Sequence, residues 1–442
     1  MLNRFFSLAL LTFANVFFCF TRDADATSRF TGQPVQTLTR DEASPWDFIE
    51  QHRDSDPRIP WEPHHPNGSV MCDQVRSAFG TDAPHANSFL LHAAPGWQDH
   101  GQATPVVLVP GAFDDATRRW ALPHQEGGHD DPRPGLMSYL AGRGSPVFAV
   151  TYSHNHGDNI YQGEALANAI QRVRSLLGRQ DDATFQVNLV AHSKGAMSVR
   201  SYVQSASGFY SDRKFLTPFR GDVSRVAFIA SPLGGLDLPY RYYIYNLQQF
   251  TQSGRAPVAA SRMILYGFWK DAGPSYLLSG HYPGQLQMLF DLRKRGVPYG
   301  LMSCTADAND SMHRLVDGGR SFFVESEGIE HAIAEGGSLI EKLNSVGFPR
   351  SVASAVLAGN KPVLYDPRLL PFRIPIGMEI TAPSDGLLFV KSALYTEGLT
   401  VGGASLLDQK TMFLNHIELT QDEDAFAWVD QMVGSGFASE SR

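Results

Sequence analysis

The chain has 442 residues, of which 43% are hydrophobic and 19% are charged, as in an ordinary globular protein that is long enough to bury a large core. Its formal net charge of −8 at pH 7 argues against binding to a nucleic-acid backbone, which requires a basic surface.

Residues 1–26 are predicted to form a signal peptide. Arg4 supplies an early positive charge, residues 5–20 are nearly all apolar, and Ala24-Asp25-Ala26 has small residues at the spacing of a cleavage site. The apolar stretch is shorter than the ~20 residues that span a bilayer, and no other stretch is suitable for a span. We therefore expect a secreted protein, extracellular or periplasmic, without a stable membrane span.

The chain has three cysteines, and their state depends on whether the protein is exported. Cys19 would leave with the signal peptide, so that Cys72 and Cys304 remain. In an exported protein these two either form one disulfide or stay as two buried thiols, and the sequence leaves both readings open.

Residues 27–103 are predicted to form an extended arm that packs on the following domain. Prolines at positions 57, 60 and 63 exclude regular structure there, because proline lacks a backbone donor and has a fixed φ. One short helix is expected near residues 73–79.

From residue 104 onward, apolar runs typical of buried strands alternate with helical patterns. In the helical stretch 164–177, for example, Leu166, Ile170, Val173 and Leu177 form one stripe. The expected strands cover 104–109, 146–152, 185–191 and 225–230, and the expected helices 135–142, 164–177 and 193–205. This alternation predicts an α/β domain over residues 104–442, with a mostly parallel sheet, right-handed crossovers and helices on both faces.

The alternation stops over about residues 232–373, where tyrosines and other aromatic residues are frequent. Helices are expected there at 284–295, 338–346 and 351–357. We interpret this stretch as a largely helical cap or lid over a binding cleft, and the alternative is plain core packing of a helical subdomain. A strand over 374–381 would resume the sheet, and a helix over 423–433 would close the domain.

Ser193 is the predicted nucleophile of the site. It follows the apolar run Val187-Asn188-Leu189-Val190, stands in a small-x-Ser-x-Gly pattern and opens a helix, as a nucleophile elbow requires. Ala191 replaces the first glycine of Gly-x-Ser-x-Gly, which is a mild change because the position needs only a tiny side chain. The alternative reading of Ser193 is a simple helix N-cap.

A serine nucleophile needs a base and an acid, which follow in the order acid, then histidine, in α/β-hydrolases. His416 lies shortly before the last helix and is the predicted base, because His281, His313 and His331 come too early. Asp385 follows the strand predicted over 374–381 and is the predicted acid. Asp307 and Asp310 are the competing acids, but they lie inside the insertion.

Two backbone N–H groups are predicted to stabilise the oxyanion of the reaction. Pro110-Gly111 ends the first strong strand, which makes the N–H of Ala112 one donor. The N–H of Lys194, the residue after the nucleophile, is the other. The alternative for Pro110-Gly111 is an ordinary turn at the end of a strand.

Residues 108–112, 190–195, 384–387 and 414–418 together resemble the secreted bacterial and fungal triacylglycerol lipases and the related extracellular esterases and polyester depolymerases. The resemblance covers roughly residues 104–232 and 374–432 and excludes the arm and the insertion. It implies an α/β-hydrolase fold and a secreted serine hydrolase that cleaves carboxylic esters, with a lipid-like substrate favoured by the aromatic insertion. Pro110-Gly111 replaces the usual His-Gly of the oxyanion loop.

No cofactor is expected, and no metal is predicted. Bacterial lipases of this type often have a calcium-binding aspartate shortly after the histidine, where this chain has Glu418. Residues His124, Glu126, His129, Asp130 and Asp131, with His154 and His156, include many ligand types but lack the spacing of a zinc site, so a solvated loop is expected.

Two further functions use the same fold. An acyltransferase would pass the acyl group to an alcohol or amine instead of water, and residues alone do not separate it from a hydrolase. A catalytically inactive binding protein is disfavoured by the ordered Ser, Asp and His. The sequence does not indicate the oligomeric state.

Overall fold

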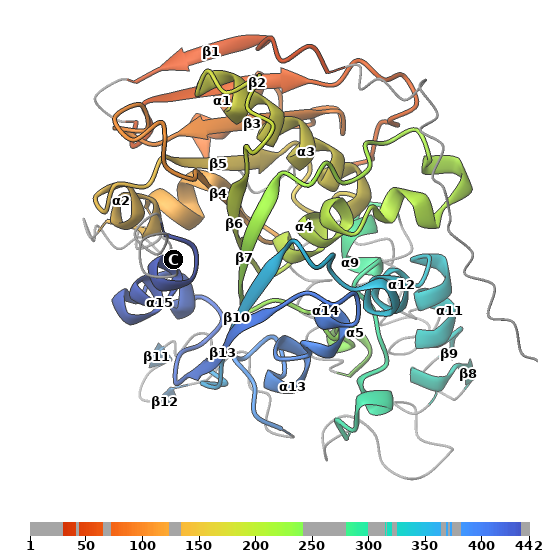
Figure 1. Ribbon diagram of the computed structural model, residues 1–442. Coiled ribbons are helices and arrows are strands. Elements are labelled where there is room, and N and C mark those ends of the chain that lie inside the picture. The colour runs from red at the N-terminus through yellow and green to blue at the C-terminus, as the bar shows by residue number, and fades with distance from the viewer. Residues whose placement is uncertain are drawn as a thin grey trace, which may run out of the picture.

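The computed structural model describes residues 30–40, 44–64, 72–122, 134–241, 280–298, 314, 316–320, 325–363, 368–369, 372–373 and 382–434. Within these residues a nine-stranded sheet has the order β1-β2-β3-β5-β4-β6-β7-β10-β13 and runs from top to bottom in Figure 1. The strands are β1 (Gln36–Thr39), β2 (Phe48–Arg53), β3 (Ser88–Ala93), β4 (Val106–Val109), β5 (Val147–Tyr152), β6 (Val187–His192), β7 (Val223–Ile229), β10 (Ala353–Gly359) and β13 (Leu406–Met412).

The strands β5, β4, β6, β7, β10 and β13 are parallel to one another, while β1, β2 and β3 pair in antiparallel fashion and β3 is also antiparallel to β5. Two short pairs lie apart from this sheet, namely β8 (Gly319–Arg320) with β9 (Glu325–Ser326) and β11 (Arg368–Leu369) with β12 (Phe372–Arg373). The predicted α/β fold with its mostly parallel sheet is confirmed.

Helices cover both faces of the sheet (Figure 1). One face carries α1 (Asp73–Phe79), the π-helical turn η1 (Thr117–Ala121), α2 (Leu136–Ala141) and α15 (Glu423–Val433). The other carries α3 (Asn159–Leu176), α4 (Gly195–Val203) and α12 (Leu339–Val346). Smaller helices are α5 (Leu238–Arg241), α9 (Pro283–Leu286), α11 (Ile329–Glu335), α13 (Val390–Ala393) and α14 (Glu397–Thr400), and 3₁₀ turns are η3 (Ala206–Phe209), η4 (Ser211–Arg213), η5 (Leu292–Arg295) and η6 (Glu418–Thr420).

The central strands are buried on both faces, which explains their continuous apolar runs. In β4, Val107 and Val109 pack into the core beneath α3 and α4, while Val106 and Leu108 pack into the core beneath α2 and α15. This alternation follows from the two-residue period of a strand. The strands predicted from such runs, and the helices predicted between them, are confirmed with small shifts at their ends.

The arm contributes more than was predicted. The helix expected near residues 73–79 is α1, but the segment also supplies β1, β2 and β3 to the main sheet. The strand β2 was not recognised because it buries Glu50 and His52. Arg172 of α3 donates two hydrogen bonds to the Glu50 carboxylate, at 2.6 and 2.8 Å, and so compensates the buried charge.

The helix predicted over 351–357 is wrong, because these residues form β10 between β7 and β13. Its small apolar residues are buried on both sides of the sheet, and this tertiary setting outweighs their helix propensity. The sheet therefore resumes at Ala353, inside the insertion predicted over 232–373. The strand predicted over 374–381 lies outside the described residues.

Other parts of the insertion are helical. The helix predicted over 338–346 is confirmed as α12, whereas the stretch 284–295 forms two separate turns, α9 and η5. At the start of the insertion, the fully buried pair Asp237–Arg241 (2.7 Å) also receives a hydrogen bond from the Leu292 backbone N–H (3.3 Å). This ion pair therefore links α5 to η5.

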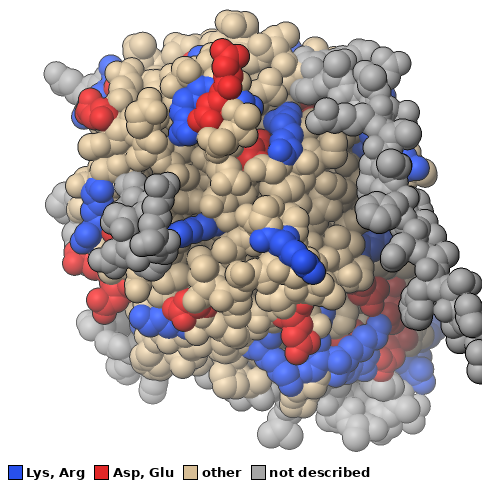
Figure 2. All heavy atoms as spheres, viewed as in Figure 1, with Lys and Arg blue, Asp and Glu red and all other residues tan. Residues whose placement is uncertain are grey.

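On the face shown in Figure 2, basic and acidic side chains are interspersed, with wide uncharged areas between them. Among the described residues, no helix combines the length and the apolar character that crossing a membrane requires. Cys72 is partly buried beside Asp115, whereas Cys304 lies outside the described residues, so their pairing stays a prediction.

Candidate active site

Ser193 occupies a sharp turn between β6 and α4. Its φ of 51° lies in the left-handed region, which is costly for a residue other than glycine and is typical of a nucleophile elbow. The turn is held by the Ser193 N–H, which donates to the Ile229 carbonyl oxygen of β7 at 3.0 Å. Ser193 itself is partly exposed, while Ala191 and His192 before it are buried.

Gly195 permits this turn by allowing α4 to touch the end of β4. A Cβ on Gly195 would lie 2.5 Å from the Pro110 carbonyl oxygen and 2.8 Å from that of Val109. We expect Gly195→Ala to lower the free energy of unfolding by about 2 kcal/mol or more, because backbone would have to move. Thermal unfolding measures this effect, with Gly208→Ala as the control, since a Cβ there meets no atom within 4 Å. Equal melting temperatures for the two variants would contradict the interpretation.

The structure brings Ser193, His416 and Asp385 into one hydrogen-bonded row. His416 Nε2 lies 3.0 Å from Ser193 Oγ, and His416 Nδ1 lies 2.8 Å from Asp385 Oδ2. The His416 N–H also donates to the Asp385 carbonyl oxygen at 2.9 Å. Asp385 and His416 are buried, so the row is open to solvent only at its serine end.

Three parallel strands of the sheet, β6, β10 and β13, bring these three residues together at their carboxyl ends. Ser193 directly follows β6, and His416 follows β13. The Asp385 loop packs on the end of β10, where a Cβ on Gly359 would lie 2.9 Å from Asp385 Cβ. Asp385 Oδ1 accepts hydrogen bonds from the backbone N–H groups of Leu387 (3.0 Å) and Leu388 (2.7 Å), which fix the carboxylate.

The competing residues do not replace these three. His331 pairs with Glu327 at 2.6 Å, on α11 and the turn before it. His313, Asp307 and Asp310 lie outside the described residues.

The two predicted oxyanion donors flank the serine. Gly111 is so close to the elbow that its Cβ would lie 2.9 Å from Ser193 Cβ. Within the described part of the chain, neither the Ala112 N–H nor the Lys194 N–H has a hydrogen-bond acceptor. Both groups are therefore available to a substrate oxygen, as an oxyanion hole requires.

Two buried side chains, those of His192 and Arg119, hold the His416 loop by hydrogen bonds, and the sequence did not indicate either of them. His192 Nε2 lies 3.1 Å from the His416 carbonyl oxygen and donates to it. Burial lowers the pKa of His192 well below its usual value, with help from the charge of Arg119, so its ring is neutral. Arg119 also pairs with Asp114 of the predicted oxyanion loop and donates to Thr420 Oγ1 at 2.7 Å. The only available signal was the position of His192 beside the nucleophile.

The Glu418 carboxylate is bound by other residues of this chain. It pairs with Lys361 and accepts a hydrogen bond from the Asn415 N–H at 3.0 Å. Among the described residues, no three His, Cys, Asp or Glu side chains are grouped to hold a metal ion. The loop 123–133 with the histidines considered for zinc lies outside these residues. His154 and His156 contact the Pro63 carbonyl oxygen and Gln285, respectively.

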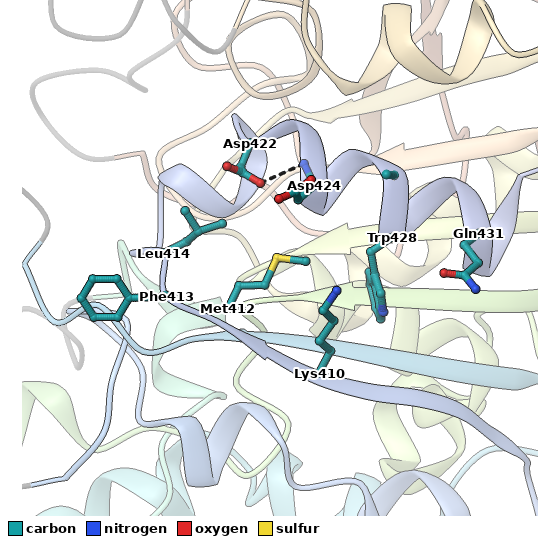
Figure 3. A pocket seen from close by; sticks show the side chains of 9 residues that line it. Lys410, Met412, Phe413, Leu414, Asp422, Asp424, Trp428 and Gln431 are labelled. Atoms are coloured by element: carbon teal, nitrogen blue, oxygen red, sulfur yellow. Dashed lines mark hydrogen bonds between the residues drawn. The ribbon is translucent and has the colours of Figure 1, made fainter.

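A pocket of about 640 Å³ lies between β13 and α15, on the edge of the sheet (Figure 3). Met412, Leu414 and Trp428 provide apolar lining, and Asp422 and Asp424 lie at its rim. None of the three residues of the hydrogen-bonded row lines it. This pocket is therefore distinct from the site around Ser193.

Residues 103–241 match the family model described as Lipase (class 2). The structure is similar to the mature lipase BlEst2 of Bacillus licheniformis (TM-score 0.38, 14% identity, 78% of this chain and 98% of that one). It is also similar to EstA of Clostridium botulinum (TM-score 0.39, 12% identity, 75% and 87%) and to lipase 1 of Pelosinus fermentans (TM-score 0.37, 12% identity, 77% and 99%). A search of curated protein sequences finds no match.

The matched segment contains β4, the predicted oxyanion loop and the Ser193 elbow, and it ends at Arg241. The strand order of the sheet and the sharp turn at Ser193 are consistent with this match. Over residues 103–241, which include the turn at Ser193, the chain is therefore similar to the lipase (class 2) family.

Proposed function

We propose that the protein cleaves esters through a Ser193–His416–Asp385 triad and an acyl-enzyme intermediate. Ser193 Oγ attacks the ester carbonyl carbon while His416 Nε2 takes the serine proton. The proton then passes to the leaving alcohol, and water, activated by the same nitrogen, releases the acid. Asp385 orients the imidazole and stabilises its charged form, and the N–H groups of Ala112 and Lys194 hold the oxyanion.

The observation that carries this proposal is the continuous row of hydrogen bonds. A base must reach the proton that it removes, and the 3.0 Å from His416 Nε2 to Ser193 Oγ meets this condition without rearrangement. The 2.8 Å contact with Asp385 selects the tautomer that has its proton on Nδ1. Nε2 then presents a lone pair to the serine.

A lipid-like ester is the substrate class that we favour, in an exported enzyme. The exposed Phe113 follows the predicted oxyanion donor and packs edge-on against His156 (ring centroids 4.0 Å apart), which in turn packs against Tyr282 (4.9 Å). These rings form an aromatic wall beside the site. The apolar N-terminal segment supports export.

A covalent probe and a substrate panel test the proposal together. We expect a fluorophosphonate to label Ser193, as located by peptide mass spectrometry, because only an activated serine reacts rapidly. The enzyme should also hydrolyse p-nitrophenyl esters over a range of chain lengths, with emulsified triglyceride and a polyester as further substrates. Failure of both labelling and hydrolysis would indicate an inactive binding protein. Acyl transfer to an added alcohol that outpaces hydrolysis would indicate an acyltransferase.

A further inference from the structure

The side chain of Lys194 is buried although the proposed reaction uses only its backbone. Lys194 is 1% exposed, and its Nζ donates a hydrogen bond of 2.5 Å to Gln162 Oε1 of α3. Removing an ammonium group from water is costly unless anions or acceptors compensate it. Any small or apolar residue would supply the same N–H at lower cost, so the buried charge calls for a second role.

Two buried carboxylates act on this ammonium from other parts of the chain. Glu62 belongs to the N-terminal arm and Asp158 caps the start of α3, and the charges of both favour protonated Lys194. They are joined to each other, because the Asp158 N–H donates to Glu62 Oε1 at 2.9 Å. Asp158 also pairs with Arg213 of η4. The residue after the nucleophile is thus connected to the arm, to α3 and to η4.

Two glycines pack closely against the lysine and against Glu62. A Cβ on Gly284 would lie 2.3 Å from Lys194 Cε, 2.7 Å from Nζ and 2.1 Å from the Gly157 carbonyl oxygen. A Cβ on Gly157 would lie 2.8 Å from Glu62 Oε2. The lysine side chain is therefore closely packed against Gly284, and the Glu62 carboxylate against Gly157.

We propose that Lys194 is a positioning residue whose buried ammonium, hydrogen-bonded to Gln162 and favoured by the nearby charges of Glu62 and Asp158, keeps its own backbone N–H directed at the oxyanion. This inference rests on the proposed function and extends it to the arm. Through the charge of Glu62, the segment that precedes the hydrolase core influences the position of this N–H. A displacement of about 1 Å in such a donor can cost on the order of 100-fold in rate.

The first test compares Lys194→Met, Glu62→Gln and the double variant. We expect Lys194→Met to lower kcat for a p-nitrophenyl ester about 10- to 100-fold, with KM changed less than threefold, because the ground-state contacts remain. Glu62→Gln should lower kcat less. The double variant should match Lys194→Met, because Glu62 acts through the lysine. Losses that multiply would show independent structural damage and overturn the proposal.

The pH dependence gives a readout that mere destabilisation would not move. Burial lowers the pKa of Lys194 to about 7, while the charges of Glu62 and Asp158 raise it. Burial, with the charge of Asp158, also raises the pKa of Glu62 to about 7, so the Glu62 charge acts on Lys194 mainly above that pH. Removing this charge therefore lowers the pKa of Lys194 further in that range, and the ammonium is lost at lower pH. His154 also faces this group, and the charge of Lys194 contributes to lowering the pKa of His154. The basic limb of the kcat profile should start at lower pH in Glu62→Gln than in the wild type, and an unshifted limb would overturn the proposal.

Gly284→Ala tests the same position without changing a charge. Its Cβ would push on the lysine, so we expect a lower kcat, whereas Gly208→Ala, where a Cβ meets no atom within 4 Å, should leave kcat unchanged. If the wild type hydrolyses the ester and reacts with the fluorophosphonate while Lys194→Met and Gly284→Ala keep full kcat, the positioning role is wrong and the proposed function stands. A wild type that does neither overturns both.

Discussion

Replacing Ser193 with alanine is expected to lower kcat for a p-nitrophenyl ester by on the order of 10⁴-fold or more. The substitution removes the attacking oxygen, which lies 3.0 Å from His416 Nε2, and leaves the fold intact, because alanine occupies the same turn. The N–H groups of Ala112 and Lys194 are untouched, so a small residual rate above the uncatalysed one should remain. Steady-state kinetics measures the loss, and circular dichroism verifies the fold.

A double variant of Ser193 and His416 tests this prediction more stringently, because the effects of residues that act together are not additive. If Ser193 and His416 act as one unit, adding His416→Ala to Ser193→Ala should reduce the remaining rate very little. Ser175→Ala, on the surface of α3, is the matched control and should keep the wild-type rate. Activity of Ser193→Ala within tenfold of the wild type would eliminate Ser193 as the nucleophile.

The parts of the fold that were predictable are those in which local pattern and tertiary setting agree. The central strands β4, β5, β6 and β7 are buried on both faces, so their apolar runs are continuous and easily recognised. The antiparallel strand β2 was missed because its buried Glu50 is neutralised by Arg172, 122 residues later in the chain. A pattern within a short stretch of sequence cannot reveal a partner that lies so far along the chain.

The same distinction applies to the site. Ser193 was recognisable because strand, turn and helix are contiguous, and His416 and Asp385 because their order along the chain is restrictive. The neighbourhood of Lys194 was not recognisable. Glu62, Gln162 and Gly284 come from the arm, α3 and the insertion, and only folding brings them around one ammonium group.

Asp385→Asn is expected to lower kcat about 10⁴-fold while the geometry of the site is retained. Asp385 Oδ1 accepts hydrogen bonds from the Leu387 and Leu388 N–H groups, so the single oxygen of an asparagine must take that position. Its NH₂ group then faces His416 Nδ1 and donates to it, which places the imidazole proton on Nε2. A protonated Nε2 cannot accept the proton of Ser193, so the base is lost although every atom is in place. Asp182→Asn, in the loop between α3 and β6 at the opposite edge of the sheet, is the matched control and should keep its activity. A rate for Asp385→Asn close to that of the control would show that another carboxylate orients His416.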